Sequence, residues 1–477
     1  MSNKAKGYPT KEFFVGMLTR DIDLSDAILD LLDNCLDGVV RQKNTSDRKT
    51  SNDYYDGYYS RITIKKDYFS IEDNCGGIPR QTAEDYAFRM GRVLGYDSGD
   101  KPTVGIYGIG MKRAIFKIGK HATVTTRHND EFYKVTIPSN WASDDNDDWK
   151  FDIEDLSDSS ILPDGGTIIE VIDFNDGIVN NWKNDDKILN YVDQLGKTIS
   201  QSYSLIIQKG FNIHINDKEV SPLHIQLLFS NDFEKDGIRP FLYHQIFDDV
   251  EVSLVIGFYA PPPSPDDIDD ENELKRSSSD AGWTIICNDR VIIYNDKSYL
   301  TGWGEAGVPQ YHTQFIGIRG VVTFYSNKPD KLPMTTTKRG IDTSSRIYSV
   351  VKDRMRQGMR IFTDYTNRWK GQNEKERVYS NTAQRLSVNS FVGEPTQIEE
   401  RIPVKFRANK GGYVYNPNLP SPPNDRQYKV IRYSKSIDEI LSIVEYIYND
   451  REYSVTPSQI GEKCFDIILD MSQKKEE

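Results

Sequence analysis

Residues 27–38, AILDLLDNCLDG, constrain the fold of this chain more than any other stretch, because their apolar and polar side chains separate at helical spacing. At about 3.6 residues per turn, Ile28, Leu32 and Leu36 share one broad apolar face. The opposite face carries Asp30, Asp33, Asn34 and Asp37. The pattern is typical of a surface helix with a solvated acidic side. Like charges at this spacing repel, however, so a cation or a positively charged partner would relieve them.

Two functions are open to this acidic face if it is not simply solvated. The side-chain carbonyl of Asn34 is a neutral oxygen ligand, which suits a hard metal such as Mg²⁺. Asp30 lies four residues earlier on the same face, where a carboxylate could orient a water molecule. The helix therefore presents candidate metal-binding and catalytic groups side by side.

The next informative stretch, IEDNCGGIP at residues 71–79, is a strand that runs into an aspartate and paired glycines. Asp73, at the strand end, can accept a hydrogen bond from an exocyclic amine. Gly76 and Gly77 permit a flat ring to approach the backbone closely. The stretch therefore favours a site for a nucleobase.

Two further glycine motifs follow. In GIYGIGMKRAIFK, residues 105–117, Gly105, Gly108 and Gly110 lead into a predicted helix. Backbone N–H groups of such a turn and the helix N-terminus form an anion site, to which Lys112 adds charge, although the pattern alone also occurs in ordinary loops. In GGTIIEV, residues 165–171, Thr167 places a hydroxyl beside two glycines at the start of a strand.

These four segments, in this order and spacing, resemble the GHKL ATPases, which include gyrase B, heat-shock chaperones, histidine kinases and MutL-type repair proteins. The resemblance covers residues 20–175. It implies a Bergerat α/β sandwich, in which helices pack on one face of a mixed sheet and ATP lies between them. It also implies that Asn34 binds Mg²⁺, that Asp73 and Gly77 bind adenine, that residues 105–112 form the lid and phosphate loop, and that Thr167 belongs to the last nucleotide motif.

Two positions depart from the family pattern. Hydrolytic members usually carry Glu four residues before the metal-binding Asn, whereas this chain has Asp30, which is one methylene shorter. The middle position of the family's DxGxG motif is Cys75 in place of Gly. Asp30 in place of Glu predicts slow hydrolysis, because the shorter side chain polarises water less effectively. Cys75 in place of Gly predicts an altered lid.

A second α/β unit carries a weaker likeness to one branch of the superfamily. Residues 288–294, NDRVIIY, resemble the NxRxI strand in the transducer domains of MutL and microrchidia (MORC) ATPases. The resemblance implies a loop lysine that reaches the γ-phosphate, where a cation lowers the barrier to phosphoryl transfer. Lys338 is the candidate, Arg339 is its competitor, and an ordinary exposed lysine is the alternative.

The sequence predicts an ATP-binding domain followed by three further segments. The predicted ranges are 1–175 for the ATP-binding domain, 176–370 for an S5-like transducer domain, 371–425 for a polar linker, and 426–477 for a small α/β or helical unit.

Composition narrows the setting of the protein. The 477 residues carry a formal net charge of -12, which argues against an electrostatic grip on nucleic acid over the whole surface. No apolar run approaches the roughly 18 residues that a membrane span needs. The four cysteines lie far apart without a metal-binding spacing. We therefore expect a cytoplasmic protein that does not bind membranes and keeps its thiols reduced.

The resemblance implies an Mg²⁺-dependent ATPase that hydrolyses ATP slowly and acts as a nucleotide-driven switch, forming a homodimer when ATP is bound. By analogy it would serve nucleic-acid processing or bacterial phage defence. Two alternatives stay open. One is a scaffold that senses ATP and barely hydrolyses it, which Asp30 favours. The other is a chaperone-like clamp on a protein client.

Overall fold

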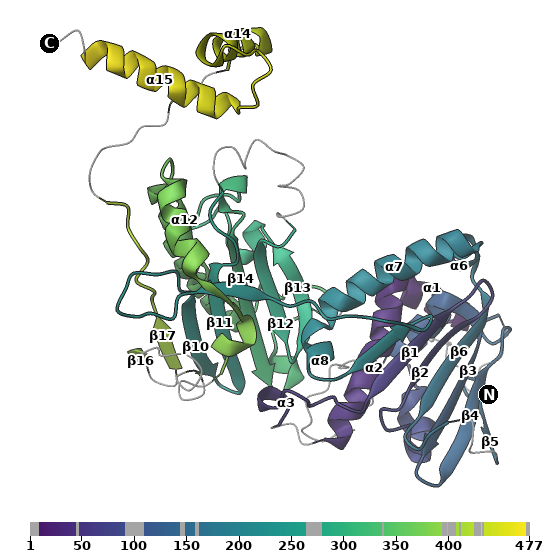
Figure 1. The fold of residues 1–477 in the computed structure, drawn as a ribbon. Coiled ribbons are helices and arrows are strands. Elements are labelled where there is room, and N and C mark those ends of the chain that lie inside the picture. The colour runs from purple at the N-terminus through teal and green to yellow at the C-terminus, as the bar shows by residue number, and fades with distance from the viewer. Residues whose placement is uncertain are drawn as a thin grey trace.

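The computed structural model describes residues 9–473 except 44–46, 91–108, 144–147, 158–161, 264–278, 336–337, 394–397, 399–406, 410–411, 424–430 and 432–433. In this part of the chain two sheets, each packed with helices, are joined side by side, and a pair of C-terminal helices lies apart from both (Figure 1). The result is a mixed α/β fold.

The first sheet has eight strands among the described residues, in the order β5-β4-β3-β6-β2-β1-β7-β8. Its strands are β1 (Tyr59–Ile64), β2 (Phe69–Asp73), β3 (Gly119–His128), β4 (Glu131–Ile137), β5 (Asp152–Asp155), β6 (Thr167–Phe174), β7 (Asn212–Ile215) and β8 (Lys218–Glu219). Neighbours are antiparallel except for β1 and β7, which are parallel. Residues 61–73, RITIKKDYFSIED, whose side chains alternate like two strands around a turn, lie in the antiparallel hairpin of β1 and β2.

Helices accompany this sheet and fill its core. They are α1 (Lys11–Arg20), α2 (Leu24–Gln42), α3 (Asp47–Thr50), α4 (Arg80–Thr82), the π-helical turn η1 (Ala83–Ala87), α5 (Gly110–Ile118), α6 (Asp176–Asn181), α7 (Asp185–Ser202) and α8 (Ser204–Gln208). The apolar face of α2 packs into one hydrophobic core with strand residues such as Ile62, Ile71 and Val124. Burial of this face fixes α2 against the sheet and so positions its opposite, acidic face.

The acidic face of α2 is not solvated, contrary to the simplest interpretation of its pattern. Asp30, Asp33 and Asp37 are all buried. The reason is tertiary: α2 lies between the first sheet and the second (Figure 1), where Arg290 and Lys338 of the second domain pair with Asp33, while Arg113 of α5 pairs with Asp30. A carboxylate is rarely buried unless it is paired, so these contacts explain the burial of Asp30 and Asp33.

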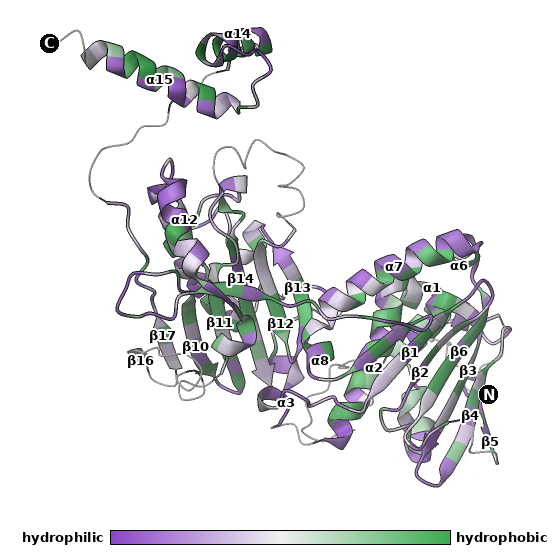
Figure 2. Ribbon diagram, in the orientation of Figure 1, coloured by the Kyte–Doolittle hydropathy of each residue, from purple (hydrophilic) through white to green (hydrophobic). Residues whose placement is uncertain are grey.

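The second sheet has seven strands in the described part of the chain, in the order β13-β12-β14-β11-β10-β17-β16. They are β10 (Phe241–Phe247), β11 (Val250–Phe258), β12 (Gly282–Cys287), β13 (Arg290–Asp296), β14 (Ile318–Ser326), β16 (Arg407–Asn409) and β17 (Gly412–Tyr415). The long helix α11 (Arg346–Arg368) buries Met355, Met359 and Phe362 in the core with this sheet. The strands of the second sheet are mostly hydrophobic (Figure 2).

The other face of the second sheet packs against a small layer. This layer is a two-stranded sheet of β9 (Gln226–Phe229) and β15 (Gln384–Ser387), followed by the turn η6 (Val388–Phe391). Phe229 and Phe391 share a core there with Leu242 and Val255 of the large sheet. Short 3₁₀ turns complete the domain: η3 (Tyr299–Thr301), η4 (Thr313–Phe315) and η5 (Pro329–Lys331).

Two segments bear on the predicted domain ranges. Strands β7 and β8 follow residue 175, where the sequence placed a boundary, yet they belong to the first sheet. Helix α12 (Asn373–Thr382), β15 and β17 lie within the predicted linker 371–425, and β17 pairs with β10. Helix α12 is mostly polar, as Figure 2 shows, and even its two buried residues, Glu376 and Ser380, are polar.

The C-terminal pair consists of α14 (Ile437–Tyr448) and α15 (Pro457–Gln473), as the sequence predicts for this region. Ser436 and Glu439 form a capping box at the start of α14. Residues 429–434, whose sequence KVIRYS favours a strand, lie largely outside the described residues. Within the described part of the chain, no helix combines the length and apolar character needed to cross a membrane.

Candidate functional site

Asp73 lies at the end of β2, where the chain leaves the first sheet. The backbone N–H of Cys75 donates to Oδ1 of Asp73 at 2.8 Å, and the thiol of Cys35 on α2 donates to Oδ2 at 3.3 Å. Burial raises the pKa of Asp73 to about 6 because desolvation disfavours the charged carboxylate, although both hydrogen bonds oppose this shift. The two hydrogen bonds therefore fix the orientation of the Asp73 carboxylate, which is partly desolvated. A carboxylate so placed can accept a hydrogen bond from an amine.

The glycines after Asp73 form a tight crossing with the GGT motif. The N–H of Gly76 donates to the carbonyl of Gly165 at 2.7 Å, so the two motifs meet. Gly77 has a φ of 65°, and a Cβ there would lie 2.1 Å from the carbonyl oxygen of Arg127. Only glycine fits this backbone, so the chain can pass close to its neighbour and leave Asp73 accessible.

Thr167 begins β6 directly beside Asp73. The antiparallel register pairs Thr167 with Asp73 on β2 and with Thr126 on β3. The hydroxyls of Thr126 and Thr167 lie 3.0 Å apart, and the N–H of Ile78 donates to Thr126 at 2.9 Å. The predicted residues Asp73, Gly77 and Thr167 thus come together. Thr126, which the sequence analysis missed, completes the group and carried no motif of its own.

Helix α2 supplies the second wall of the site. The Nδ2 atom of Asn34 is buried and has no hydrogen-bond partner among the described residues. Asp30 is buried and accepts from Nη2 of Arg113 on α5 at 2.5 Å. A Cβ at Gly110, the first residue of α5, would lie 3.4 Å from Cβ of Asp30. The start of α5 therefore lies directly against the predicted catalytic position.

The phosphate-loop residues are described only in part. Gly105 and Gly108 lie outside the described residues. Lys112, on the first turn of α5, is buried and donates to the carbonyl of Ala87 at 2.9 Å. Burial lowers its pKa to about 8 because desolvation disfavours the ammonium form. Lys112 would thus lose its charge in mildly alkaline solution.

A buried charge cluster joins α2 to the second domain. Asp33 accepts from Nζ of Lys338 at 2.9 Å, from Nε of Arg290 at 3.1 Å and from the hydroxyl of Tyr203 at 2.9 Å. Burial alone would raise the pKa of Asp33, but Lys338 and Arg290 outweigh it and hold this pKa below its usual value. The cluster places the candidate lysine of the second domain one residue from Asn34.

Lys338 and Arg339, the two basic candidates for contact with the γ-phosphate, have different partners in the structure. Lys338 is only 9% exposed and adopts a left-handed φ of 56°, so it is not an ordinary exposed lysine. Arg339 instead forms an ion pair with Asp26 near the start of α2. The sequence did not indicate that Asp33 binds the cations of the second domain. Its position beside Asn34 and three residues after Asp30, on the same acidic face, could have suggested such a partner.

In the first domain, glycine turns and strand ends surround the carboxylate of Asp73, opposite Asn34, whose Nδ2 has no partner among the described residues. This arrangement is typical of a nucleotide-binding domain. A family model agrees: residues 22–162 match that of the histidine kinase-, DNA gyrase B-, and HSP90-like ATPases. The match supports the GHKL superfamily and ATP binding for this part of the chain. It includes Asp30, Asn34 and Asp73 and ends before Thr167. No curated protein matches the chain.

The residues present fit ATP and its metal. The side-chain amide of Asn34 has one oxygen that suits a hard cation. Its nitrogen, Nδ2, which has no partner among the described residues, could donate to a phosphate oxygen. The described residues contain no group of three or more His, Cys, Asp or Glu side chains arranged for a metal. Mg²⁺ is commonly bound by one or two protein groups together with substrate phosphates and water, which matches a site with a single amide ligand.

Proposed function

We propose that this protein is an Mg²⁺-dependent ATPase of the MORC/MutL-like branch, in which ATP drives a conformational switch. The domain built on the second sheet would be the transducer. The observation that carries the proposal is the ion pair of Lys338 with Asp33, which brings a cation of the second domain to the helix of Asn34. A basic side chain so placed can exchange between a carboxylate and a phosphate.

In the proposed site, Asp73 accepts a hydrogen bond from the adenine amine, and the backbone at Gly77 and the hydroxyl of Thr167 line the same edge. Asn34 holds the metal, and Gly110 and Lys112 at the start of α5 bind the phosphates. Gly105 and Gly108, which the resemblance also assigns to the phosphate loop, lie outside the described residues. Bound Mg²⁺ would neutralise charge on the phosphate oxygens. The protein groups thus bind the two ends of the nucleotide from two different walls.

Hydrolysis would use Asp30 to orient water and Lys338 to stabilise charge on the γ-phosphate. Arg113 already binds Oδ2 of Asp30, so water would be held through the other oxygen. Asp30 is one methylene shorter than the Glu of hydrolytic family members, so we propose that it orients water less effectively and that turnover is slow. The same substitution favours the alternative function, a scaffold that binds ATP and barely hydrolyses it.

The switch follows from competition for Lys338. Without a γ-phosphate, Lys338 is bound to Asp33; with one, the lysine has a second anionic partner on the same side of α2. Ordering of loops by γ-phosphate contacts is a common route to such switching. We propose that it favours a homodimer in the cytoplasm and that the client is nucleic acid, as in bacterial phage defence. A chaperone-like protein clamp is the alternative.

Two experiments test these points. Light scattering after size exclusion, with and without a non-hydrolysable ATP analogue, should show a dimer only with the nucleotide; an unchanged mass contradicts the switch. Phosphate release should fall to background in Asp30→Ala while calorimetric ATP binding persists. Equal rates in wild type and variant would favour the scaffold. Salt-sensitive DNA co-sedimentation distinguishes a nucleic-acid client from a protein client.

A further inference from the structure

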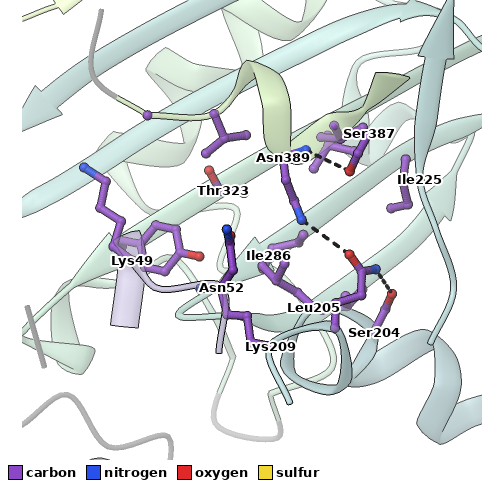
Figure 3. A pocket seen from close by; sticks show the side chains of 17 residues that line it. Lys49, Asn52, Ser204, Leu205, Lys209, Ile225, Ile286, Thr323, Ser387 and Asn389 are labelled. Atoms are coloured by element: carbon purple, nitrogen blue, oxygen red, sulfur yellow. Dashed lines mark hydrogen bonds between the residues drawn. The ribbon is translucent and has the colours of Figure 1, made fainter. Parts of the chain in front are cut away.

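A cavity of about 300 Å³ lies at the junction of the two domains, away from the candidate nucleotide site. Side chains from α3, α8, the second sheet and the segment 387–393 converge on it (Figure 3). None of the predicted nucleotide-site residues is among the described residues that line it. The cavity is therefore a separate feature of the domain junction.

The floor of this cavity is apolar. Ile286, Val291 and Val321 of the second sheet face Leu205 and Val388 across it, and all five belong to the hydrophobic core on that face of the sheet. Protein interiors rarely leave voids much larger than a water molecule. A space of about ten water volumes at such a place is at the lower end of the size range of small-molecule pockets.

The remaining wall is polar and basic. The described lining residues include Lys49 and Lys209 but no Asp or Glu. Behind the wall each ammonium has one carboxylate partner, Glu251 for Lys49 and Asp289 for Lys209, so a ligand would be bound by their remaining N–H donors. Gln208 and Asn389 add side-chain amides, joined by a hydrogen bond of 3.3 Å that Figure 3 shows. An apolar floor opposite a wall with lysines and amides is complementary to a molecule with an apolar body and one anionic end.

The basic wall is also part of the bond between the domains. Lys209 donates to Oδ1 of Asp289 at 2.9 Å and to the carbonyl of Arg48 at 2.5 Å, which are two of its three N–H donors. Tyr325, another lining residue, also donates to Asp289. The carboxylate of Asp289, fully buried at the β12–β13 turn, accepts in addition from Arg48 and from Tyr55 of the first domain, each at 3.1 Å.

We propose that this cavity binds a small amphipathic anion, with an apolar body of about ten non-hydrogen atoms that ends in a carboxylate or a group of like charge. Its anionic end lies at Lys209 and Lys49, and its body lies on Val291 and Val321. The ligand contacts both domains at once. It therefore binds the docked arrangement and stabilises it by mass action.

The test uses the full chain and three probes of one length: octanoate, 1-octanol and octylammonium. In titration calorimetry, octanoate should bind once per chain and about tenfold more tightly than octylammonium, the factor that one charge-assisted hydrogen bond supplies. Octanoate should also raise the melting temperature. Equal affinities for the three probes, or no binding of octanoate, would overturn the proposal.

Two variants locate the site. Ile225→Trp places a large ring in the cavity from a half-buried position and should abolish octanoate binding. Val179→Trp, on α6 and 47% exposed, is the matched control and should bind as wild type does. Lys49→Met removes one of the two cations and should weaken octanoate binding while leaving 1-octanol binding unchanged. Octanoate binding that persists in Ile225→Trp would place the ligand elsewhere and contradict the assignment.

A measurement on the wild-type chain keeps the test independent of folding defects. The side chain of Lys49 is 22% exposed, so an acylating reagent can reach its amine. Octanoate in the cavity should slow acylation of Lys49, as read by mass spectrometry, while octylammonium should not. Unchanged labelling at saturating octanoate would also refute the proposal.

Discussion

Replacing Asp33 by Asn tests whether the buried cluster joins the two domains. The variant keeps the side-chain shape but removes the charge that Lys338 and Arg290 share. These side chains are only 10% and 3% exposed, so both cations would lose their carboxylate in a desolvated place. Breaking a buried ion pair by removal of one partner costs about 3–5 kcal/mol. We expect a loss of this size in the free energy of unfolding.

The pH dependence of the same cluster has a defined sign. The pKa of Asp33 lies below its usual value of 3.8, so its contribution is present above that pH and is lost as pH falls through the lower, folded value. The pKa of Lys338 lies above 10.5 because Asp33 outweighs its burial, so its contribution is present below that pH and is lost as pH rises further. Between these limits the pair should be insensitive to pH.

The assay is urea unfolding followed by circular dichroism and tryptophan fluorescence, with each transition fitted separately because the chain has more than one domain. Asp193→Asn is the matched control: its carboxylate lies 3.4 Å from Lys218, and the two side chains are 50% and 76% exposed. An exposed pair of this kind contributes at most about 1 kcal/mol. If Asp33→Asn is no less stable than Asp193→Asn, the cluster does not hold the domains together and the reasoning is refuted.

Three further predictions concern the nucleotide site. Asp73→Asn should abolish ATP binding in calorimetry, yet the nucleotide-free variant should unfold no more easily at pH 7. The pKa of Asp73 is about 6 in the folded state and 3.8 ordinarily, so ionisation of this carboxyl at pH 7 costs the folded state about 3 kcal/mol. Asn cannot ionise and avoids this cost. Retained ATP affinity in the variant would contradict the adenine assignment. Gly77→Ala should lower the melting temperature more than Gly57→Ala, because both have positive φ but only Gly77 has a backbone oxygen 2.1 Å from the new Cβ; equal losses would show that the crossing is not tight. ATP affinity should fall as pH rises through about 8, the pKa of Lys112, and Lys112→Met should remove this fall; an unchanged pH profile in the variant would exclude Lys112.

The mixed α/β fold and part of the candidate site were predictable because their signals are local. Each signal lies within about ten consecutive residues and follows the spacing that helices and turns impose. The signals are the apolar face of α2, the strand that ends at Asp73 and the glycines around Gly77. The family match over residues 22–162 agrees with that reading. The roles of Lys338 and Thr167 in binding or catalysis stay predictions.

Long-range pairing decided the rest. The carboxylate of Asp33 is buried because Lys338, 305 positions away in the sequence, reaches it from another domain. Strand β7 belongs to the first sheet because it lies parallel to β1, and that pairing leaves no mark in the composition of either strand. By itself, the sequence determined which residues form helices, turns and strand ends, since these follow from local periodicity. Only the tertiary structure determined which charges are desolvated together, because desolvation depends on what packs against a side chain and not on its neighbours in the chain.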